Sequence, residues 1–120
     1  MDDSTGRKFQ KELNGGLVGL VLLAVLEASS EDLYGYEIAK RLAIANDGTS
    51  IFKEGTIYPV LRALSAANLL TSRIVPSYSG PARRYYRITD QGRAVLAEWT
   101  AIWQGTRSFV DHFIETGQSS

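Results

Sequence analysis

The spacing of hydrophobic and polar positions changes along the chain, and each spacing predicts a different element. Residues 7–28 carry apolar side chains at intervals of three and four, which predicts a helix. The middle of this helix, residues 17–26, contains only apolar residues and glycine. A helix without a polar side is normally buried, so we expect it to be covered by the core and, in part, by a second chain. We expect the polar residues 1–6 to fray.

A second helix is predicted over residues 34–46. Ile38, Leu42 and Ala45 repeat at helical spacing and would form its buried side. The sequence Asn-Asp-Gly at residues 46–48 predicts the end of this helix, because these residue types tolerate the left-handed backbone conformation that follows many helices.

The start of the third helix is inferred from a proline. Pro59 lacks an amide hydrogen, so it is tolerated in the first turn of a helix and costly further in. We therefore expect the helix to begin near Gly55 and Thr56, with Thr56 as the N-cap, and to end near Asn68. Its expected buried positions are Ile57, Val60, Leu61 and Leu64. Its expected polar face carries Tyr58, Arg62 and Ser65.

Beyond the third helix the spacing changes to two. This alternation predicts β-strands over residues 70–75 and 83–89, joined by a loop at residues 76–82. In the second strand Tyr86 and Ile88 should face the core, because alternate residues of a strand point to the same side.

Thr89 can cap a last helix over residues 90–115. An apolar seam runs along this helix at alternating intervals of three and four, which is typical of a helix that packs lengthwise on a partner. Its members are Leu96, Trp99, Trp103, Thr106, Val110 and Phe113. Gly105 should weaken the middle of the helix.

The composition limits the chemistry that the chain can perform. Its 120 residues, 44% hydrophobic and 22% charged, are typical of one globular unit. There is no cysteine, which excludes disulfides, thiolate metal sites and cysteine nucleophiles. The single histidine, His112, should lie on a solvent-facing helix surface, and neither paired carboxylates nor a glycine-rich phosphate loop occurs at a usable spacing. We therefore expect no enzymatic activity, no metal and no cofactor.

The formal net charge is zero, but the charges are unevenly distributed. Residues 27–52 hold five acidic and two basic side chains, whereas residues 53–93 hold seven basic and two acidic ones. A locally basic segment indicates an anionic polymer as a partner.

The apolar run at residues 17–26 is shorter than the roughly 18 residues that a membrane span requires. A signal peptide is the stronger alternative, because Arg7, Lys8 and Lys11 precede the run. Glu27, however, stands where a cleavage site would be neutral. We expect a cytoplasmic protein with no membrane partner.

The predicted order of three helices and a hairpin is that of a winged helix-turn-helix. The expected fold class is therefore mainly α with a small β-hairpin, followed here by a C-terminal dimerisation helix. In this fold the third helix enters the major groove of DNA, and the hairpin, called the wing, reaches phosphates or the minor groove. The candidate DNA contacts are Thr56, Tyr58 and Arg62 on the helix and Arg83 and Arg84 on the wing.

Each of these residues also has a simpler explanation. Tyr58 with Arg62 would make a surface cation–π pair, and Thr56 would serve only as a cap. Arg83 and Arg84 would be a solvated strand end. The joint arrangement of a helix start, a polar face and a charged hairpin tip favours a DNA-binding surface.

Three segments resemble the PadR family of bacterial transcriptional regulators. They are GYEIAK at residues 35–40, EGTIYPVL at residues 54–61, and residues 80–92, in which Gly-Pro is followed by Arg-Arg-Tyr-Tyr-Arg-Ile-Thr and a glycine. The resemblance implies an N-terminal winged helix and a final helix that dimerises by packing on the partner's first helix. It also implies repression of transcription, often relieved by a small molecule. By position, the resemblance assigns Tyr36 and Lys40 to the second-helix motif, Thr56, Tyr58 and Arg62 to the recognition helix, and Arg83 and Arg84 to the wing.

Two parts of the chain are expected from these observations. Residues 1–89 would form the DNA-binding unit, whose first helix also contributes to the dimer, and residues 90–120 would form the dimerisation helix. A two-fold homodimer would bind half-sites about one duplex turn apart, so the expected operator is double-stranded DNA with an inverted repeat. A winged helix that binds a protein rather than DNA is the alternative function.

Trp99 and Trp103 lie one turn apart on the last helix, and two roles are open for them. They would either pack in the dimer interface or provide a platform for a small hydrophobic or aromatic effector.

Overall fold

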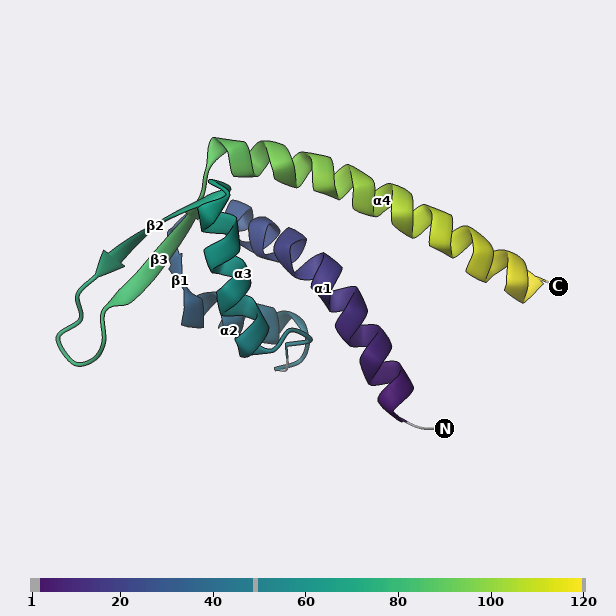
Figure 1. Ribbon diagram of the computed structural model, residues 1–120, viewed down its shortest axis with the longest axis horizontal. Coiled ribbons are helices and arrows are strands. Elements are labelled where there is room, and N and C mark those ends of the chain that lie inside the picture. The colour runs from purple at the N-terminus through teal and green to yellow at the C-terminus, as the bar shows by residue number, and fades with distance from the viewer. Residues whose placement is uncertain (1–2, 49, 120) are drawn as a thin grey trace.

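A small antiparallel sheet joins three helices at one end of the molecule, and a fourth helix extends away from them (Figure 1). The computed structural model describes residues 3–48 and 50–119. Its element order is α1 (Asp3–Ala28), β1 (Leu33–Tyr34), α2 (Gly35–Ala45), α3 (Glu54–Ala66), β2 (Leu70–Val75), β3 (Arg83–Ile88) and α4 (Asp90–Ser119). The predicted winged-helix order of three helices followed by a hairpin is confirmed.

The C-terminal half of α1 forms one wall of the core. Val18, Leu22 and Leu26 follow one another at intervals of four and are buried, because that row of the helix faces α3 and the sheet. The helix begins at Asp3, so the expectation that residues 3–6 fray is wrong. The rest of that expectation, residues 1 and 2, lies outside the described residues.

The length of α1 also bears on the question of a membrane. Although its uninterrupted apolar run is short, the stretch Ser4–Ala28 is long and apolar enough as a whole to cross a bilayer. A core helix of a soluble protein passes the same test. The buried row of α1 lies in the core of this domain.

A strand of two residues, β1, precedes α2 and is not predicted from the sequence. It pairs with β3 in antiparallel register, with Leu33 opposite Tyr86 and Tyr34 opposite Tyr85. The sheet therefore has three strands in the order β1-β3-β2 rather than the two of a simple hairpin.

The bounds of α2 agree with the prediction to within one residue. Ile38 and Leu42 are buried as expected, whereas Ala45, the last residue of the helix, is exposed. The helix ends as predicted, because Asp47 and Gly48 have positive φ angles of 52° and 89°.

The start of α3 differs from the prediction. Its N-cap is Lys53, in extended conformation, and Thr56 lies inside the first turn, so the assignment of Thr56 as N-cap is wrong. Pro59 is inside the helix rather than in its first turn. The missing amide of Pro59 costs the carbonyl of Gly55 its helical hydrogen bond, and Gly55 is exposed, so water can bond there instead.

The end of α3 is a left-handed cap formed by an asparagine. Asn68 has a φ of 63°, and the amide of the next residue, Leu69, donates to the carbonyl of Leu64 at 2.9 Å. The helix thus ends two residues before the predicted position, and Asn68 turns the chain into β2.

The wing consists of β2, β3 and the connecting loop of residues 76–82. The two strands pair from Leu70 opposite Ile88 to Val75 opposite Arg83. Tyr86 and Ile88 are buried as predicted, because they point to the side of the sheet that faces the helices.

Thr89 joins the wing to α4. Its hydroxyl oxygen accepts a hydrogen bond from the amide of Gly92 at 2.9 Å, as expected of an N-cap, and donates to the carbonyl of Asn68 at 2.7 Å. Gly92 packs so closely on the carbonyl of Leu69 that a Cβ atom would overlap it. The direction in which α4 leaves the sheet is therefore set by close packing.

Only the first part of α4 is covered by the rest of the chain. Leu96 and Trp99 pack against the core, whereas Val110 and Phe113 are exposed. The helix continues through Gly105 to Ser119, beyond its predicted end. Figure 1 shows that α1 and α4 approach each other near the sheet and diverge toward the two termini.

The core lies among α1, α2, α3 and the inner face of the sheet. Its buried hydrophobic members are Val18, Leu22, Leu23, Leu26, Leu33, Ile38, Ala39, Leu42, Phe52, Ile57, Leu61, Leu64, Leu69, Leu70, Tyr86 and Ile88. Three of the four expected buried positions of α3 are among them, and Val60 packs against the cluster while half-buried.

Candidate nucleic-acid interface

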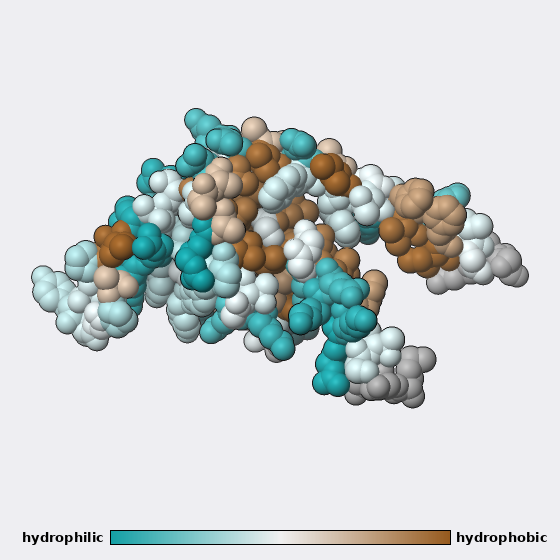
Figure 2. Space-filling model, viewed as in Figure 1, coloured by the Kyte–Doolittle hydropathy of each residue, from teal (hydrophilic) through white to brown (hydrophobic). Residues whose placement is uncertain are grey.

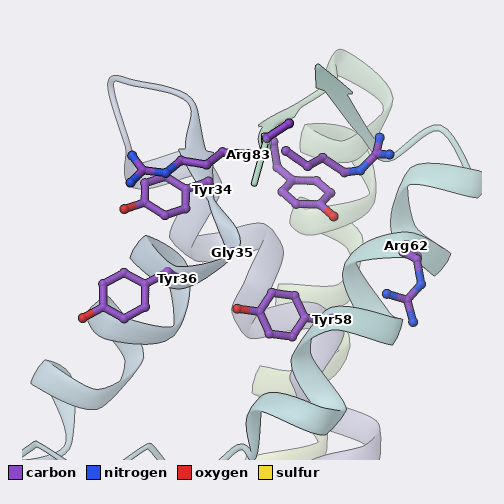
Figure 3. Close-up of a pocket in the computed structure, with 9 residues that line it drawn as sticks. Tyr34, Gly35, Tyr36, Tyr58, Arg62 and Arg83 are labelled. Atoms are coloured by element: carbon purple, nitrogen blue, oxygen red, sulfur yellow. The ribbon is translucent and has the colours of Figure 1, made fainter. Parts of the chain in front are cut away.

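A cleft of about 340 Å³ lies where the start of α2, the middle of α3 and the wing meet (Figure 3). Five of the seven residues predicted to bind DNA line this cleft: Tyr36, Tyr58, Arg62, Arg83 and Arg84. The other lining residues are Tyr34, Gly35, Ala82 and Tyr86. Side chains up to 52 residues apart in the chain are thus brought to one surface, which we call the arginine–tyrosine cleft.

The remaining two predicted residues do not line the cleft. Lys40 is exposed on α2, and Thr56 is exposed in the first turn of α3. The amide of Thr56 donates to the carbonyl of Lys53 at 2.9 Å. This amide is therefore engaged within the protein and is not free to bind phosphate.

Tyr58 is held at the centre of the cleft by Gly35. A Cβ atom at position 35 would overlap the ring of Tyr58, so only glycine at the start of α2 allows α3 to approach this closely. Burial is the main cause that raises the pKa of Tyr58, and the nearby negative charge of Glu54 raises it further. The phenol therefore stays protonated and can donate a hydrogen bond from the cleft.

Arg62 is exposed one turn after Tyr58 on α3. Figure 3 shows its guanidinium on the outer side of α3, away from the ring of Tyr58. The predicted third member of this polar face, Ser65, differs: its Oγ is buried and has no hydrogen-bond partner among the described residues. The outward-facing part of the predicted polar face is therefore limited to Tyr58 and Arg62.

Some basic side chains of residues 53–93 make ion pairs with carboxylates, and the others do not. Arg73 and Arg87 pair with Asp32, at 3.1 Å and 2.8 Å. Arg93 pairs with Glu27 and Asp90, both at 2.8 Å. The basic side chains of this segment that make no ion pair within residues 3–48 and 50–119 are Lys53, Arg62, Arg83 and Arg84. Three of these four line the arginine–tyrosine cleft.

Two of the paired arginines, Arg73 on β2 and Arg87 on β3, lie on the outer side of the sheet. Asp32, with 12% of its side chain exposed, receives hydrogen bonds from both Arg73 and Arg87. The bond from Arg87, and secondly that from Arg73, lower the pKa of Asp32, although burial acts in the opposite direction. Asp32 is therefore a carboxylate at neutral pH and neutralises much of the charge at the base of the wing.

Wing residues nearer the loop have weaker contacts that leave their charge uncompensated. Arg84 donates to the Oγ of Ser72 at 3.1 Å, and the guanidinium of Arg83 lies 4.6 Å from the centre of the Tyr34 ring. Tyr78, in the loop at the tip, is fully exposed. Positive charge is thus greatest on the side of the wing that faces the cleft.

The sequence is also similar to known regulators. The model of the transcriptional regulator PadR-like family matches residues 22–98, which include α2, α3, the whole wing and the start of α4. The chain belongs to the PadR-like family. Members of this family are transcriptional regulators, so the protein is a regulator of transcription and not an enzyme.

Three relatives show how far the PadR-like similarity extends. A PadR family transcriptional regulator of Eggerthella lenta DSM 2243 is 33% identical, with a TM-score of 0.75 over 95% of this chain and 96% of that chain. The probable transcriptional regulator Rv1176c of Mycobacterium tuberculosis is 32% identical over 83 residues, 68% of this chain and 41% of that protein. The Bacillus subtilis PadR, solved in complex with operator DNA, is 25% identical, with a TM-score of 0.61 over 70% of this chain and 46% of that chain.

A second feature of this PadR-like chain is an apolar groove between α1 and α4, with a volume of about 490 Å³. It is lined by Glu12, Leu13, Gly16, Leu17, Leu20, Trp99, Ile102, Trp103 and Thr106. Figure 2 shows hydrophobic surface in the middle of the molecule and again near the C-terminal end of α4. Trp99 and Trp103 therefore both line the groove, while Trp99 also packs against the core.

Sequence reasoning missed two residues of these surfaces. Tyr34 was placed only as the start of a helix, although its ring lines the cleft and contacts Arg83. Asp32 is only one of the five acidic residues counted in the stretch 27–52, although it binds two arginines of the wing. The short β1 brings both residues beside β3, and a strand of two residues leaves no periodic signal in the sequence.

Proposed function

We propose that the protein binds double-stranded DNA through the arginine–tyrosine cleft and represses transcription as a homodimer on an inverted-repeat operator. The observation that carries the proposal concerns the basic segment of residues 53–93. Its arginines that make no ion pair among the described residues, Arg62, Arg83 and Arg84, all line one cleft between α3 and the wing. An exposed arginine that has no carboxylate partner keeps its charge and its N–H donors available, so it can bind a phosphate or the edge of a guanine base. That the related Bacillus subtilis PadR was solved with operator DNA supports the same partner here.

In this proposal the part of α3 that carries Tyr58 and Arg62 enters the major groove. Arg62 would contact a base edge or a phosphate from the outer side of the helix, and Tyr58 would donate a hydrogen bond beside it. Arg83 and Arg84 would contact the phosphates that flank the groove. Tyr36 and Lys40 on α2, with Thr56 on α3, would complete the contacts to the DNA backbone.

The dimer would form through α1 and α4. Residues 90–120 would act as the dimerisation helix of a DNA-binding unit that spans residues 1–89. The apolar groove between α1 and α4, together with exposed Phe109, Val110 and Phe113 on α4, leaves a surface that a second copy of the chain would cover. Burial of one large aromatic side chain contributes roughly 2–3 kcal/mol, so a paired arrangement would be favoured.

A small aromatic effector would bind between Trp99 and Trp103 of the two copies and relieve repression. The apolar lining of the groove supports this ligand class. With its apolar α1 row packed in the core, the protein would act in the cytoplasm, where its DNA lies.

The DNA-binding proposal is tested with Arg62→Ala. We expect its affinity for the duplex upstream of its own gene to fall about tenfold or more at physiological salt, and the slope of affinity against salt to decrease by about one. Fluorescence anisotropy with non-specific duplex as competitor measures both. Arg107→Ala is the matched control, because Arg107 lies on α4 and has only an exposed ion pair with Asp111 at 3.6 Å. Equal affinity of Arg62→Ala and the control would refute the proposal, and binding to a protein instead would favour the alternative function.

The dimer is tested separately with Ile102→Asp. Ile102 is exposed in the single chain, so the substitution should leave the fold intact, but it would bury a carboxylate in the proposed interface. Sedimentation should show a monomer. Ile44→Asp is the control, because Ile44 is also exposed, but on α2 and outside the groove. A dimer of unchanged affinity in Ile102→Asp would place the interface elsewhere.

A further inference from the structure

Tyr34 lies at the junction of β1 and α2, directly beside the wing (Figure 3). Its backbone is held on two sides. It is paired with Tyr85 of β3 in the sheet, and its amide donates to a carboxylate oxygen of Glu37 in the first turn of α2 at 3.1 Å. The position of Tyr34 is thus tied to both the sheet and α2.

The ring of Tyr34 contacts two other aromatic rings. It stacks on Tyr36 with a centroid separation of 6.3 Å and an interplanar angle of 21°. It also meets Tyr85 edge-on at 5.3 Å. Neighbours on two sides limit the rotation of the ring, which makes it a fixed surface for a third group.

That third group is the guanidinium of Arg83, 4.6 Å from the centre of the Tyr34 ring. An exposed arginine otherwise samples many rotamers, and ordering it on binding costs free energy. Stacking on a fixed ring removes part of that cost before the ligand arrives. It also ties the end of the wing to the start of α2, two elements that both line the cleft.

Two other wing arginines differ from Arg83 because a carboxylate compensates their charge. Arg73 also lies over a ring, 5.0 Å from the centre of Tyr85, but both Arg73 and Arg87 donate hydrogen bonds to Asp32. A ring face, in contrast, contacts the flat side of a guanidinium and leaves its N–H donors and its charge at the edge available. Tyr34 therefore orients Arg83 without neutralising it.

We propose that Tyr34 is a positioning residue that pre-orients Arg83 for a phosphate of the bound duplex. This inference rests on the proposed DNA-binding function. Tyr34 itself need not touch the DNA, since its effect acts through Arg83.

The test is a double-mutant cycle between Tyr34→Leu and Arg83→Ala, measured as affinity for the duplex upstream of the protein's own gene. Arg83→Ala should weaken binding. Tyr34→Leu alone should weaken it about two- to fivefold, which is the fold-change that an exposed cation–π contact implies. In the Arg83→Ala background the same change at Tyr34 should have no further effect. Tyr34→Phe keeps the ring face and should bind like the wild type.

The outcomes separate this inference from the proposed function. If Arg83→Ala weakens binding but Tyr34→Leu does not, or if the two effects simply add, Tyr34 does not position Arg83, and the DNA-binding proposal stands. If Arg83→Ala binds as tightly as the wild type, the assignment of Arg83 to the DNA interface fails as well.

A second variant covers the case in which Tyr34→Leu does not fold. Arg83→Lys keeps the charge and leaves Tyr34 in place, but an ammonium group lacks the flat face that stacks on the ring. We expect Arg83→Lys to bind about two- to fivefold more weakly. Arg84→Lys is the matched control, because Arg84 contacts the Oγ of Ser72 and no ring among the described residues, and it should change affinity less. Equal effects at the two positions would overturn the inference.

Discussion

The contact between Gly35 and Tyr58 gives a sharp prediction about the junction of α2 and α3. In Gly35→Ala the new methyl group would overlap the ring of Tyr58, and the three atoms nearest to it all belong to that ring. Either the two helices separate or the ring turns out of its place in the cleft. Both responses should lower stability and DNA affinity together.

The magnitude follows from two opposing effects. Overpacking of a well-packed site costs about 1–3 kcal/mol. Replacing glycine by alanine in a helix returns up to about 1 kcal/mol. We therefore expect a net loss of about 0.5–2 kcal/mol, which for a chain of this size lowers Tm by about 2–9 °C.

Thermal and urea unfolding at a fixed protein concentration measure this loss. Gly15→Ala is the matched control, because Gly15 is an exposed residue in the interior of α1 and a Cβ there meets nothing within 4 Å. This control should gain stability. The double variant Gly35→Ala/Tyr58→Ala should be no less stable than Tyr58→Ala alone, since the clashing ring is gone. If Gly35→Ala is as stable as the wild type, or if the double variant still loses stability, the contact does not limit residue 35.

Three further substitutions test other parts of the structure. Gly92→Ala should lower the free energy of unfolding by about 1–3 kcal/mol, measured by urea unfolding. Its methyl group would overlap the carbonyl of Leu69, and a backbone atom cannot move away as a side chain can. A variant as stable as the wild type would show that α4 can leave the sheet in another direction. Asp32→Asn should lower the free energy of unfolding at pH 7. Because the pKa of Asp32 is lowered in the folded state, the difference in stability from the wild type should vanish as the pH falls through that pKa. A difference that persists at low pH would contradict the role of the carboxylate charge. Leu61→Ala should cost about 2–5 kcal/mol, since Leu61 is fully buried, and a loss below 1 kcal/mol would place it outside the core.

The elements that the sequence predicts well are those with several regular repeats. The predicted bounds of the first wing strand agree with the structure, and those of the second agree to within one residue, because both strands carry a regular alternation. The predicted start of α3 is wrong for two reasons. Thr56 is a residue type that often caps helices, and the prediction assumes that Pro59 must lie in the first turn. The exposed carbonyl of Gly55 can bond to water, and so the proline is accommodated further into the helix.

For the candidate site, the residue types were predictable and their partners were not. The basic segment pointed to seven cations, but which of them are free depends on carboxylates far away in the chain. Arg73 and Arg87 lie 41 and 55 residues from Asp32, and Arg93 lies 66 residues from Glu27. Such pairs depend on tertiary packing, which periodicity and local motifs do not encode.

The single residue between β3 and α4 has a mechanical consequence. Thr89 bonds at once to the turn after α3 and to the first turn of α4, and Gly92 is wedged against the same turn. Because these contacts tie α4 closely to the turn after α3, a change in the tilt of α4 would also move β3 and the end of α3. In the proposed dimer, the angle at which the two copies of α4 cross would therefore set the distance between the two arginine–tyrosine clefts.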